Sequence, residues 1–409
     1  MNFITNLRIK NFFSIKNEVN IDFKASNYNI ENNRNRLFEI NGKYYNKVIS
    51  LYGANASGKT TFLKSIVVLS AVINNESTEK FPTSFKNKFA HLSTKSEIDI
   101  GFILEMDNEP KAFLYQLKFK SENHKNIGIE NEELYVVKGE KKEILFNRKT
   151  QQVKNVETLI SQAIFENLSD KKSLFQEFGK FEKTGCLKKI THFFRNLSKT
   201  SNIISPYETR LAPSPIDEVQ IGIRLDDNEI KEALENFLLS FLNSVGLDID
   251  QLKAKFEEDN EKGRQFLGIQ VSHKIQKTIF LEFGLESDGT LMLIKILLDI
   301  FLVKINKAIL IIDEFDSIIH PMLIPLIINL LIENGIQIIY STHNIYNMKF
   351  LQTDEIFLIE KDKNHQTTIQ AVRNIENIKG YENLLSLYEN GYLGGIPKVE
   401  EIITEIVSW

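Results

Sequence analysis

The chain has 409 residues, of which 42% are hydrophobic and 25% are charged, and its 50 Lys and Arg against 54 Asp and Glu leave a net charge of −4. These fractions exclude a mostly disordered chain. The near-neutral balance argues against extensive coating of nucleic acid, although it leaves room for a local basic patch. No run of about eighteen uncharged apolar residues is present, so no transmembrane helix is expected.

Cys186 is the single cysteine. It excludes an internal disulfide and a multi-cysteine metal site, as is typical of proteins in a reducing compartment. The opening residues lack the basic-then-apolar pattern of a secretory signal. We therefore expect a cytoplasmic protein with no membrane partner. The length predicts two or three domains, or one domain that carries an insertion.

The first third of the chain is predicted to be rich in strands. Two strands around a turn are expected in residues 3–23, followed by a loop in residues 24–44. Residues 48–52 form a short apolar run that ends in glycine, which indicates a buried strand, and helical spacing begins at Lys59. Further strands are expected around 98–104, 112–119 and 133–137.

The middle of the chain changes to helix-like segments, from about residue 150 to 262. The clearest apolar stripe comprises Ile230, Leu234, Phe237, Leu238, Phe241 and Leu242. Strands are expected again at 266–271 and 278–283. The last third alternates between helices (290–305, 321–333, 380–390) and strands (308–312, 336–341, 354–360), which predicts an α/β fold with a parallel sheet.

Residues 53–60, Gly-Ala-Asn-Ala-Ser-Gly-Lys-Thr, match the phosphate-binding loop (P-loop) pattern G-x-x-x-x-G-K-[ST] in full. A predicted strand precedes the motif and a predicted helix follows it, which is the context that the chemistry requires. Glycines let the backbone N–H groups point at phosphate oxygens, and the helix N-terminus adds positive potential. Lys59 is expected to reach the β- and γ-phosphates and Thr60 to ligate Mg²⁺.

Two later strands end in polar residues. Asp313 and Glu314 follow an apolar strand, and in P-loop enzymes the first such carboxylate holds Mg²⁺ while the second orients or deprotonates water. His343 ends the next strand, thirty residues after Asp313. That interval fits one strand–helix–strand unit, so both strand ends are expected at the same edge of the sheet. Read alone, a histidine at a strand end would be an ordinary surface residue.

A Ser-Asp-Gly-Thr turn at residues 287–290 precedes an apolar helix. A small polar turn at a helix start can bind anions, and this one could meet a nucleotide held by a second copy of the chain. The alternative is an ordinary helix cap, which spacing does not exclude.

Together, the P-loop, the Ser-x-Gly turn, the Asp-Glu strand and the histidine strand resemble the ABC-type ATPase heads of the SMC and RecF group. Residues 7–16 are similar to the N-terminal strand and base-side loop of that family. Residues 286–290, 313–321 and 389–397 are similar to its compact branch, the ATP-binding subunits of bacterial phage-defence systems such as the AbiL, RloA, PARIS, Septu and OLD-like proteins. The resemblance covers roughly residues 1–140 and 265–400.

The resemblance implies an ABC-ATPase head with a mixed sheet and a mostly helical insertion. The implied domains are an N-terminal lobe with the P-loop (1–145), the insertion (146–264) and a C-terminal lobe (265–409). ATP and Mg²⁺ are the implied ligands. Residues implied to contact them are Asn11, Gly53, Asn55, Ala56, Ser57, Gly58, Lys59, Thr60 and Thr61, with Asp313 as metal support, Glu314 as catalytic base and His343 as γ-phosphate switch.

The resemblance also implies partners. Ser287 and Gly289 would complete the nucleotide site of a second copy, in a head-to-head dimer that could extend to a higher oligomer. No nuclease-like carboxylate cluster follows His343, so a nuclease effector is expected as a separate subunit. The chain departs from the family in two further respects: Asp288 replaces a small residue, and the Q-loop glutamine has no clear counterpart, Gln116 being a candidate.

The function predicted on this basis is an ATPase with ATP-dependent dimerisation that controls an antiviral effector. One alternative is a RecF- or SMC-like repair ATPase that acts directly on DNA. Another is a nucleotide-gated scaffold with little hydrolysis.

Residues 171–199 contain eight Lys or Arg against two Glu, with five phenylalanines interleaved. This segment is interpreted either as a nucleic-acid or partner surface, or as an amphipathic helical segment whose phenylalanines lie in a core.

Overall fold

The structure is a computed structural model. It describes residues 1–74, 85–122, 125–199, 228–259, 263–274, 281–282, 287–362, 364, 366–375, 378 and 384–394. The chain divides into two compact units: the first comprises Met1–Tyr207, Val303–Ser317 and Pro321–Trp409, and the second Glu208–Leu302 and Ile318–His320. Among the described residues, no helix combines the length and the apolar character needed to cross a bilayer.

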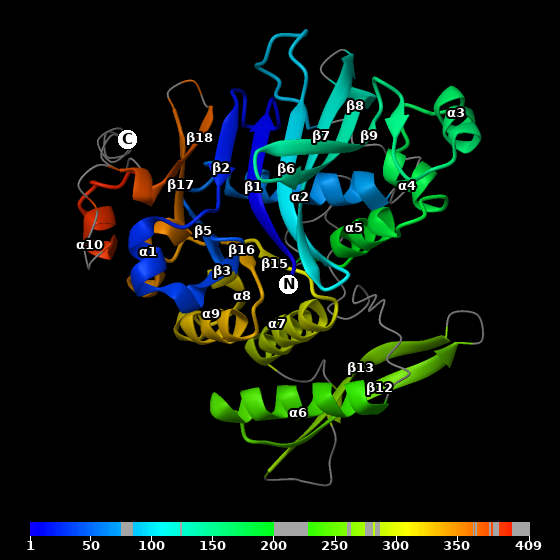
Figure 1. The fold of residues 1–409 in the computed structure, drawn as a ribbon. Helices are drawn as coiled ribbons and strands as arrows, with labels where there is room; N and C mark the ends of the chain where they lie inside the picture. Colours follow the sequence, from blue (N-terminus) through cyan, green and yellow to red (C-terminus); the bar gives the residue numbers. More distant parts are fainter. Residues whose placement is uncertain are drawn as a thin grey trace, which may run out of the picture. The chain divides into compact units, whose positions relative to one another are not determined.

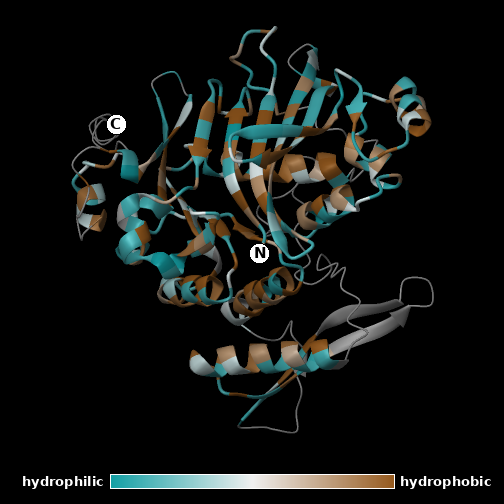
Figure 2. Cartoon of the chain, in the orientation of Figure 1, coloured by the Kyte–Doolittle hydropathy of each residue, from teal (hydrophilic) through white to brown (hydrophobic). Residues whose placement is uncertain are grey.

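The first unit contains an antiparallel sheet of seven strands in the order β10-β9-β8-β7-β6-β1-β2 (Figure 1). Its strands are β1 (Phe3–Lys10), β2 (Val19–Asp22), β6 (Glu97–Met106), β7 (Glu109–Glu122), β8 (Lys125–Lys138), β9 (Lys141–Asn147) and β10 (Gln152–Val153). Apolar and polar residues alternate along several of these strands (Figure 2), and along β7 buried positions alternate with partly exposed ones. This period of two is that of a sheet with one face in a core.

The second sheet of this unit is mostly parallel and has the order β11-β15-β16-β5-β17-β18. Its strands are β5 (Val48–Tyr52), β11 (Ser198–Lys199), β15 (Leu310–Ile312), β16 (Ile338–Ser341), β17 (Ile356–Lys361) and β18 (Thr367–Ala371). Only β18 runs antiparallel to its neighbour. The predicted parallel sheet of the last third is therefore confirmed, and β5 from the N-terminal part joins it between β16 and β17.

Helices pack against both sheets. The longer ones in this unit are α2 (Lys59–Asn74), α3 (Thr158–Glu166), α5 (Cys186–Arg195) and α9 (Ile324–Glu333), and the shorter ones are α1 (Asn27–Asn32), α4 (Leu174–Gly179), α8 (Phe315–Ile318) and α10 (Leu384–Glu389). One core cluster contains buried side chains of α2, α4 and α5 together with those of β1, β6, β7, β5 and β16. The helix that follows the P-loop is thus held in the main core of the unit.

The prediction of a loop in residues 24–44 is wrong. The segment forms α1 and the strand β3 (Leu37–Ile40), which pairs with β4 (Lys43–Asn46). Phe38 stacks on Phe3 with ring centroids 4.3 Å apart, and Tyr45 is buried beside them. The local sequence has no hydrophobic period that would predict this hairpin. The hairpin is fixed instead by the contacts of Phe38 and Tyr45 with Phe3, which is distant in the sequence.

Residues 158–195 also differ from the expected domain division, since α3, α4 and α5 belong to the first unit. Four of the five phenylalanines of the basic segment, Phe175, Phe178, Phe193 and Phe194, are buried in the main core, whereas Phe181 is exposed. The amphipathic interpretation is confirmed for these four. Burial of their side chains is what attaches the segment to the sheet.

The second unit contains α6 (Asn228–Ser244), most of α7 (Asp288–Ile305) and a sheet of β12 (Ile249–Asp259), β13 (Gly263–His273) and β14 (Leu281–Glu282). The apolar stripe predicted for α6 is confirmed, because Leu234, Leu238 and Leu242 are buried. The strand predicted at 266–271 is confirmed by β13, whereas its antiparallel partner β12 lies in the segment that was expected to be helical. Parts of the predicted strand 278–283 and helix 380–390 lie outside the described residues.

Candidate nucleotide-binding site

The P-loop connects β5 to α2 and passes close to the backbone of β17 and to the side chain of Thr367 in β18. A Cβ atom on Gly53 would lie 2.1 Å from the carbonyl oxygen of Ile359, and one on Gly58 would lie 2.5 Å from Thr367 Oγ1. Gly58 also has φ of 121°, a conformation that favours glycine. Both motif glycines are therefore required by the close approach of other backbone and side-chain atoms, in addition to the curl of the loop.

Lys59 begins α2 and is buried, with its amine inside the P-loop. Its Nζ donates to the carbonyl oxygens of Gly53 at 2.9 Å and Ala54 at 3.1 Å. Burial lowers the pKa of Lys59 to about 8, while the nearby carboxylates of Asp313, Glu314 and Asp316 oppose that shift. The amine is thus surrounded by acceptors and is poised between its charged and neutral forms.

Asp313 and Glu314 follow β15, and Ser341 ends the adjacent parallel strand β16. Asp313 is buried, and its Oδ1 accepts a hydrogen bond from the Ser341 hydroxyl. The same Ser341 oxygen accepts the backbone N–H of Glu314 at 2.8 Å. Glu314 has φ of 52°, which residues other than glycine rarely adopt, and its side chain is exposed to the pocket. Backbone strain of this kind is typical of functional sites.

His343 lies just beyond the end of β16. Its backbone N–H donates to Asp316 Oδ1 at 3.0 Å, which anchors the turn that carries the imidazole. Burial lowers the pKa of His343, and the neighbouring positive charge of Lys59 lowers it further. Both effects favour the neutral imidazole, which can donate and accept a hydrogen bond, while the carboxylates of Asp316, Glu314 and Asp313 oppose them. As expected, the ends of β15 and β16 meet at one edge of the sheet.

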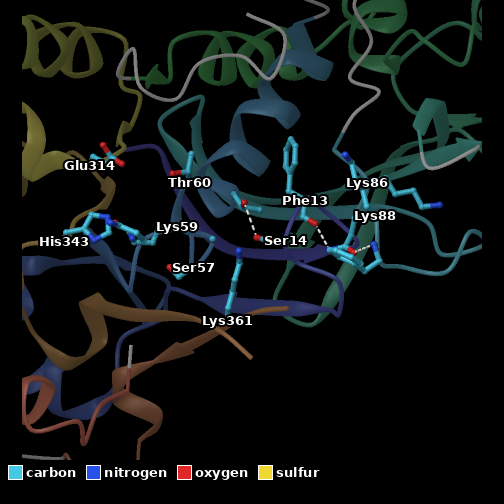
Figure 3. Close-up of a pocket in the computed structure, with 16 residues that line it drawn as sticks. Phe13, Ser14, Ser57, Lys59, Thr60, Lys86, Lys88, Glu314, His343 and Lys361 are labelled. Atoms are coloured by element: carbon cyan, nitrogen blue, oxygen red, sulfur yellow. Dashed lines mark hydrogen bonds between the residues drawn. The ribbon is translucent and has the colours of Figure 1, made fainter. Parts of the chain in front are cut away.

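A pocket of about 790 Å³ opens over this edge (Figure 3). The predicted residues that line it are Asn55, Ala56, Ser57, Gly58, Lys59, Thr60, Thr61, Glu314 and His343. The pocket is also lined by residues that were not predicted to contact the nucleotide, namely Phe13, Ser14, Lys86, Asn87, Lys88, Phe89 and Lys361. The pocket therefore receives side chains from the N-terminal loop, the segment after α2 and the end of β17.

Asn11 is buried behind the pocket wall and is not among the lining residues. Its Oδ1 accepts the N–H of Asn87 at 3.2 Å, and its Nδ2 donates to the Thr94 carbonyl at 2.9 Å. Asn87 Nδ2 in turn donates to the carbonyl of Phe13. Asn11 thus holds the segment after α2 against the N-terminal loop, which is a supporting position.

Gln116 lies on β7, away from the P-loop pocket. Its Nε2 donates to Asp99 Oδ2 at 2.7 Å, and it lines a separate small pocket with Arg8 and Glu133. This position gives no support to a Q-loop role for Gln116.

The Ser-x-Gly turn belongs to the second unit. Ser287 Oγ accepts the N–H of Thr290 at 3.2 Å, which caps the start of α7. Ser287 and Gly289 are both exposed, and a Cβ on Gly289 would meet no atom within 4 Å. The turn is thus open to contact from outside the unit. Glu286 and residues 395–397 of the similar segments lie outside the described residues.

The polar groups of this site fit a nucleoside triphosphate with Mg²⁺. An amine, a helix N-terminus and exposed loop N–H groups converge where phosphates would bind. Ser57 Oγ is buried in the loop with no hydrogen-bond partner among the described residues, which leaves a polar group available to a ligand. Thr60 and Asp313 supply the hydroxyl and carboxylate oxygens that Mg²⁺ prefers.

A strand–P-loop–helix unit whose strand belongs to a mostly parallel sheet, with an acidic strand end in the same sheet, defines a P-loop nucleotide-binding fold. Residues 48–348 match the family described as "AAA domain, putative AbiEii toxin, Type IV TA system", and the chain belongs to this family. No curated protein matches the chain.

Two solved structures are similar in outline. The SMC head domain from Thermotoga maritima shares 13% identity with a TM-score of 0.44, covering 90% of this chain and 98% of that one. An SMC head bound to the C-terminal winged-helix domain of ScpA shares 12% identity with a TM-score of 0.47. The match covers 90% of this chain and 97% of that one.

Proposed function

We propose that this chain binds and hydrolyses ATP as an ABC-type ATPase subunit. The observation that carries the proposal is the convergence of Lys59, Glu314 and His343 at one pocket, with the buried carboxylate of Asp313 close enough to act on the charge of Lys59. Each group has a chemical task in phosphoryl transfer. A simple anion site would not need the start of one helix and two strand ends to bring such groups together.

In the proposed reaction, Lys59 and the P-loop N–H groups neutralise the phosphate oxygens. Thr60 and Asp313 would hold Mg²⁺, and the bound ion would supply positive charge to the oxygens of the terminal phosphoryl group. Glu314 accepts a proton from the attacking water as the water oxygen bonds to the terminal phosphorus. The bond from that phosphorus to the bridging oxygen breaks, which yields ADP and phosphate. The neutral imidazole of His343 orients that water or a terminal phosphate oxygen by hydrogen bonding.

We further infer that ATP joins two copies head to head. Support comes from the exposed Ser287 and Gly289, which would meet the terminal phosphate held at Lys59 of the other copy. The closed dimer would persist until Glu314 acts, so a slow ATPase would keep a signal for a long time.

The biological setting that we propose is phage defence, in which the nucleotide state controls a separate nuclease effector. This rests on the resemblance to compact defence ATPases and on the description of the family as a putative toxin. A subunit whose dimer geometry follows ATP turnover is suited to restrain such an effector.

The experiment compares phosphate release and dimer content of wild type, Glu314→Gln and a surface control, Glu333→Gln. We expect Glu314→Gln to lower turnover at least about a hundredfold while it accumulates ATP-bound dimer, because the base is lost and binding is kept. Adding Ser287→Arg to Glu314→Gln should prevent the ATP-bound dimer from forming. Equal phosphate release from wild type and Glu314→Gln would instead favour a nucleotide-gated scaffold.

A further inference from the structure

The hairpin formed by β17 and β18 lies against the P-loop without a gap. The two closest approaches come from its two strands, since Ile359 O in β17 crowds Gly53 and Thr367 in β18 crowds Gly58. This hairpin lies beyond residues 48–348, the part of the chain that the family match covers.

Thr367 is almost fully buried and bonds to two segments at once. Its Oγ1 lies 2.8 Å from the carbonyl oxygen of Ser57 in the P-loop and 2.7 Å from Ser14 Oγ in the N-terminal loop. Its backbone N–H donates to the carbonyl of Ser14 at 3.1 Å. A carbonyl oxygen can only accept, so the Thr367 hydroxyl donates to the carbonyl oxygen of Ser57. The Ser14 hydroxyl can then donate to Thr367 Oγ1.

The Ser57 carbonyl matters because of the peptide plane to which it belongs. In a trans peptide, the carbonyl of Ser57 and the N–H of Gly58 point in opposite directions. When Thr367 fixes the carbonyl on the hairpin side, it fixes the Gly58 N–H toward the inside of the loop, where phosphates bind. The hydroxyl of Thr367 therefore sets the direction of a phosphate-binding donor that it does not touch.

Lys361 stands directly opposite Thr367 in the strand register. Its exposed side chain reaches into the pocket near Ser14 and Ser57 (Figure 3). The hairpin thus brings a positive charge to the pocket from the residue that pairs with Thr367, the residue that contacts the P-loop.

We propose that the β17–β18 hairpin is a working part of the nucleotide site, with Thr367 as a positioning residue for the P-loop and Lys361 as a contact for the bound nucleotide. The inference rests on the proposed function, because it names further residues of the same site.

The main test is the dissociation constant for ATP with Mg²⁺, measured by calorimetry on the full chain. Thr367→Val keeps the shape of the side chain and removes its hydroxyl, and we expect about tenfold weaker binding from the lost hydrogen bond. Thr367→Ser keeps the hydroxyl and should bind within about twofold of wild type. Thr368→Val is the matched control, because Thr368 is the next residue of β18 and is exposed.

Thermal unfolding of the same nucleotide-free variants measures how well they are packed, so a loss of ATP binding through positioning can be told from a loss through packing. A packing role would make Thr367→Ser, which loses a methyl group, as harmful to binding as Thr367→Val, and that result would overturn the proposal. So would a Thr367→Val protein that binds ATP like Thr368→Val. If wild type itself failed to bind ATP, the proposed function would fail, whereas the other two results contradict the hairpin role alone.

Lys361→Gln tests the second half of the proposal. We expect ATP binding to weaken about three- to tenfold at low ionic strength, with a smaller difference at high salt, because the charge is exposed. Lys349→Gln, which changes an exposed lysine outside the pocket, should bind like wild type. Equal affinities of the Lys361 and Lys349 variants at low salt would remove Lys361 from the site.

Discussion

The hydroxyl of Ser341 and the carboxylate of Asp313 are hydrogen-bonded across the ends of two adjacent parallel strands. The same hydroxyl oxygen accepts the backbone N–H of Glu314. One small side chain therefore fixes both the proposed metal-supporting carboxylate and the backbone of the proposed catalytic base.

Replacing Ser341 by Ala should lower the turnover of ATP by about ten- to a hundredfold, as is typical when a group that orients a metal ligand is lost. Steady-state phosphate release and its dependence on Mg²⁺ concentration measure the effect. Ser50→Ala is the control, because Ser50 is also buried in this sheet and its hydroxyl donates to a backbone carbonyl, that of Glu355, at 2.6 Å. If both variants lose turnover equally, the bond to Asp313 has no special role.

The depressed pKa of Lys59 predicts a pH dependence of nucleotide binding. Burial lowers this pKa to about 8, and bound phosphates would raise it again, so binding takes up a proton wherever the free amine is neutral. Affinity should be constant well below pH 8 and fall as the pH rises above 8, by up to about tenfold per unit. The terminal phosphate is already fully ionised in this range and adds little.

Calorimetry at pH 8.5 in buffers of different ionisation enthalpy counts the protons directly. Wild type should take up most of one proton per ATP, and the Lys59→Met variant, as far as it still binds, should take up none. No uptake by wild type would show that Lys59 is charged before the nucleotide arrives.

The buried ion pair of Arg148 and Glu132 predicts a large effect on stability. Glu132 is fully buried and accepts from Arg148 at 3.1 Å, from Ser173 Oγ at 2.7 Å and from the N–H of Leu174 at 2.9 Å, at the start of α4. Arg148→Met removes the countercharge and leaves a buried carboxylate, which should cost about 3–5 kcal/mol in the free energy of unfolding.

Urea unfolding followed by circular dichroism measures this loss. Lys149→Met, at the neighbouring exposed position, should change stability by less than about 0.5 kcal/mol. Glu132→Gln combined with Arg148→Met should recover part of the loss, because no unpaired charge then remains in the core. A stable Arg148→Met protein would mean that Glu132 finds a substitute partner.

The amino-acid sequence by itself determined the P-loop, the strand before it and the helix after it. It also determined the strand end that carries Asp313 and Glu314 and the one that carries His343. These features are local: a motif of eight residues or an apolar run carries its own backbone preference. The same holds for α6, whose apolar stripe fixes both the helix and its buried face.

Only the tertiary structure decided which distant segments complete the site. Lys86, Lys88 and Lys361 have no motif around them, and Thr367 has no spacing relation to Ser57, since 310 residues separate the two. The hairpin at residues 37–46 and the burial of Phe193 likewise depend on partners elsewhere in the chain. Contacts between segments so far apart follow from how the sheets order their strands, and that order is a property of the packed core.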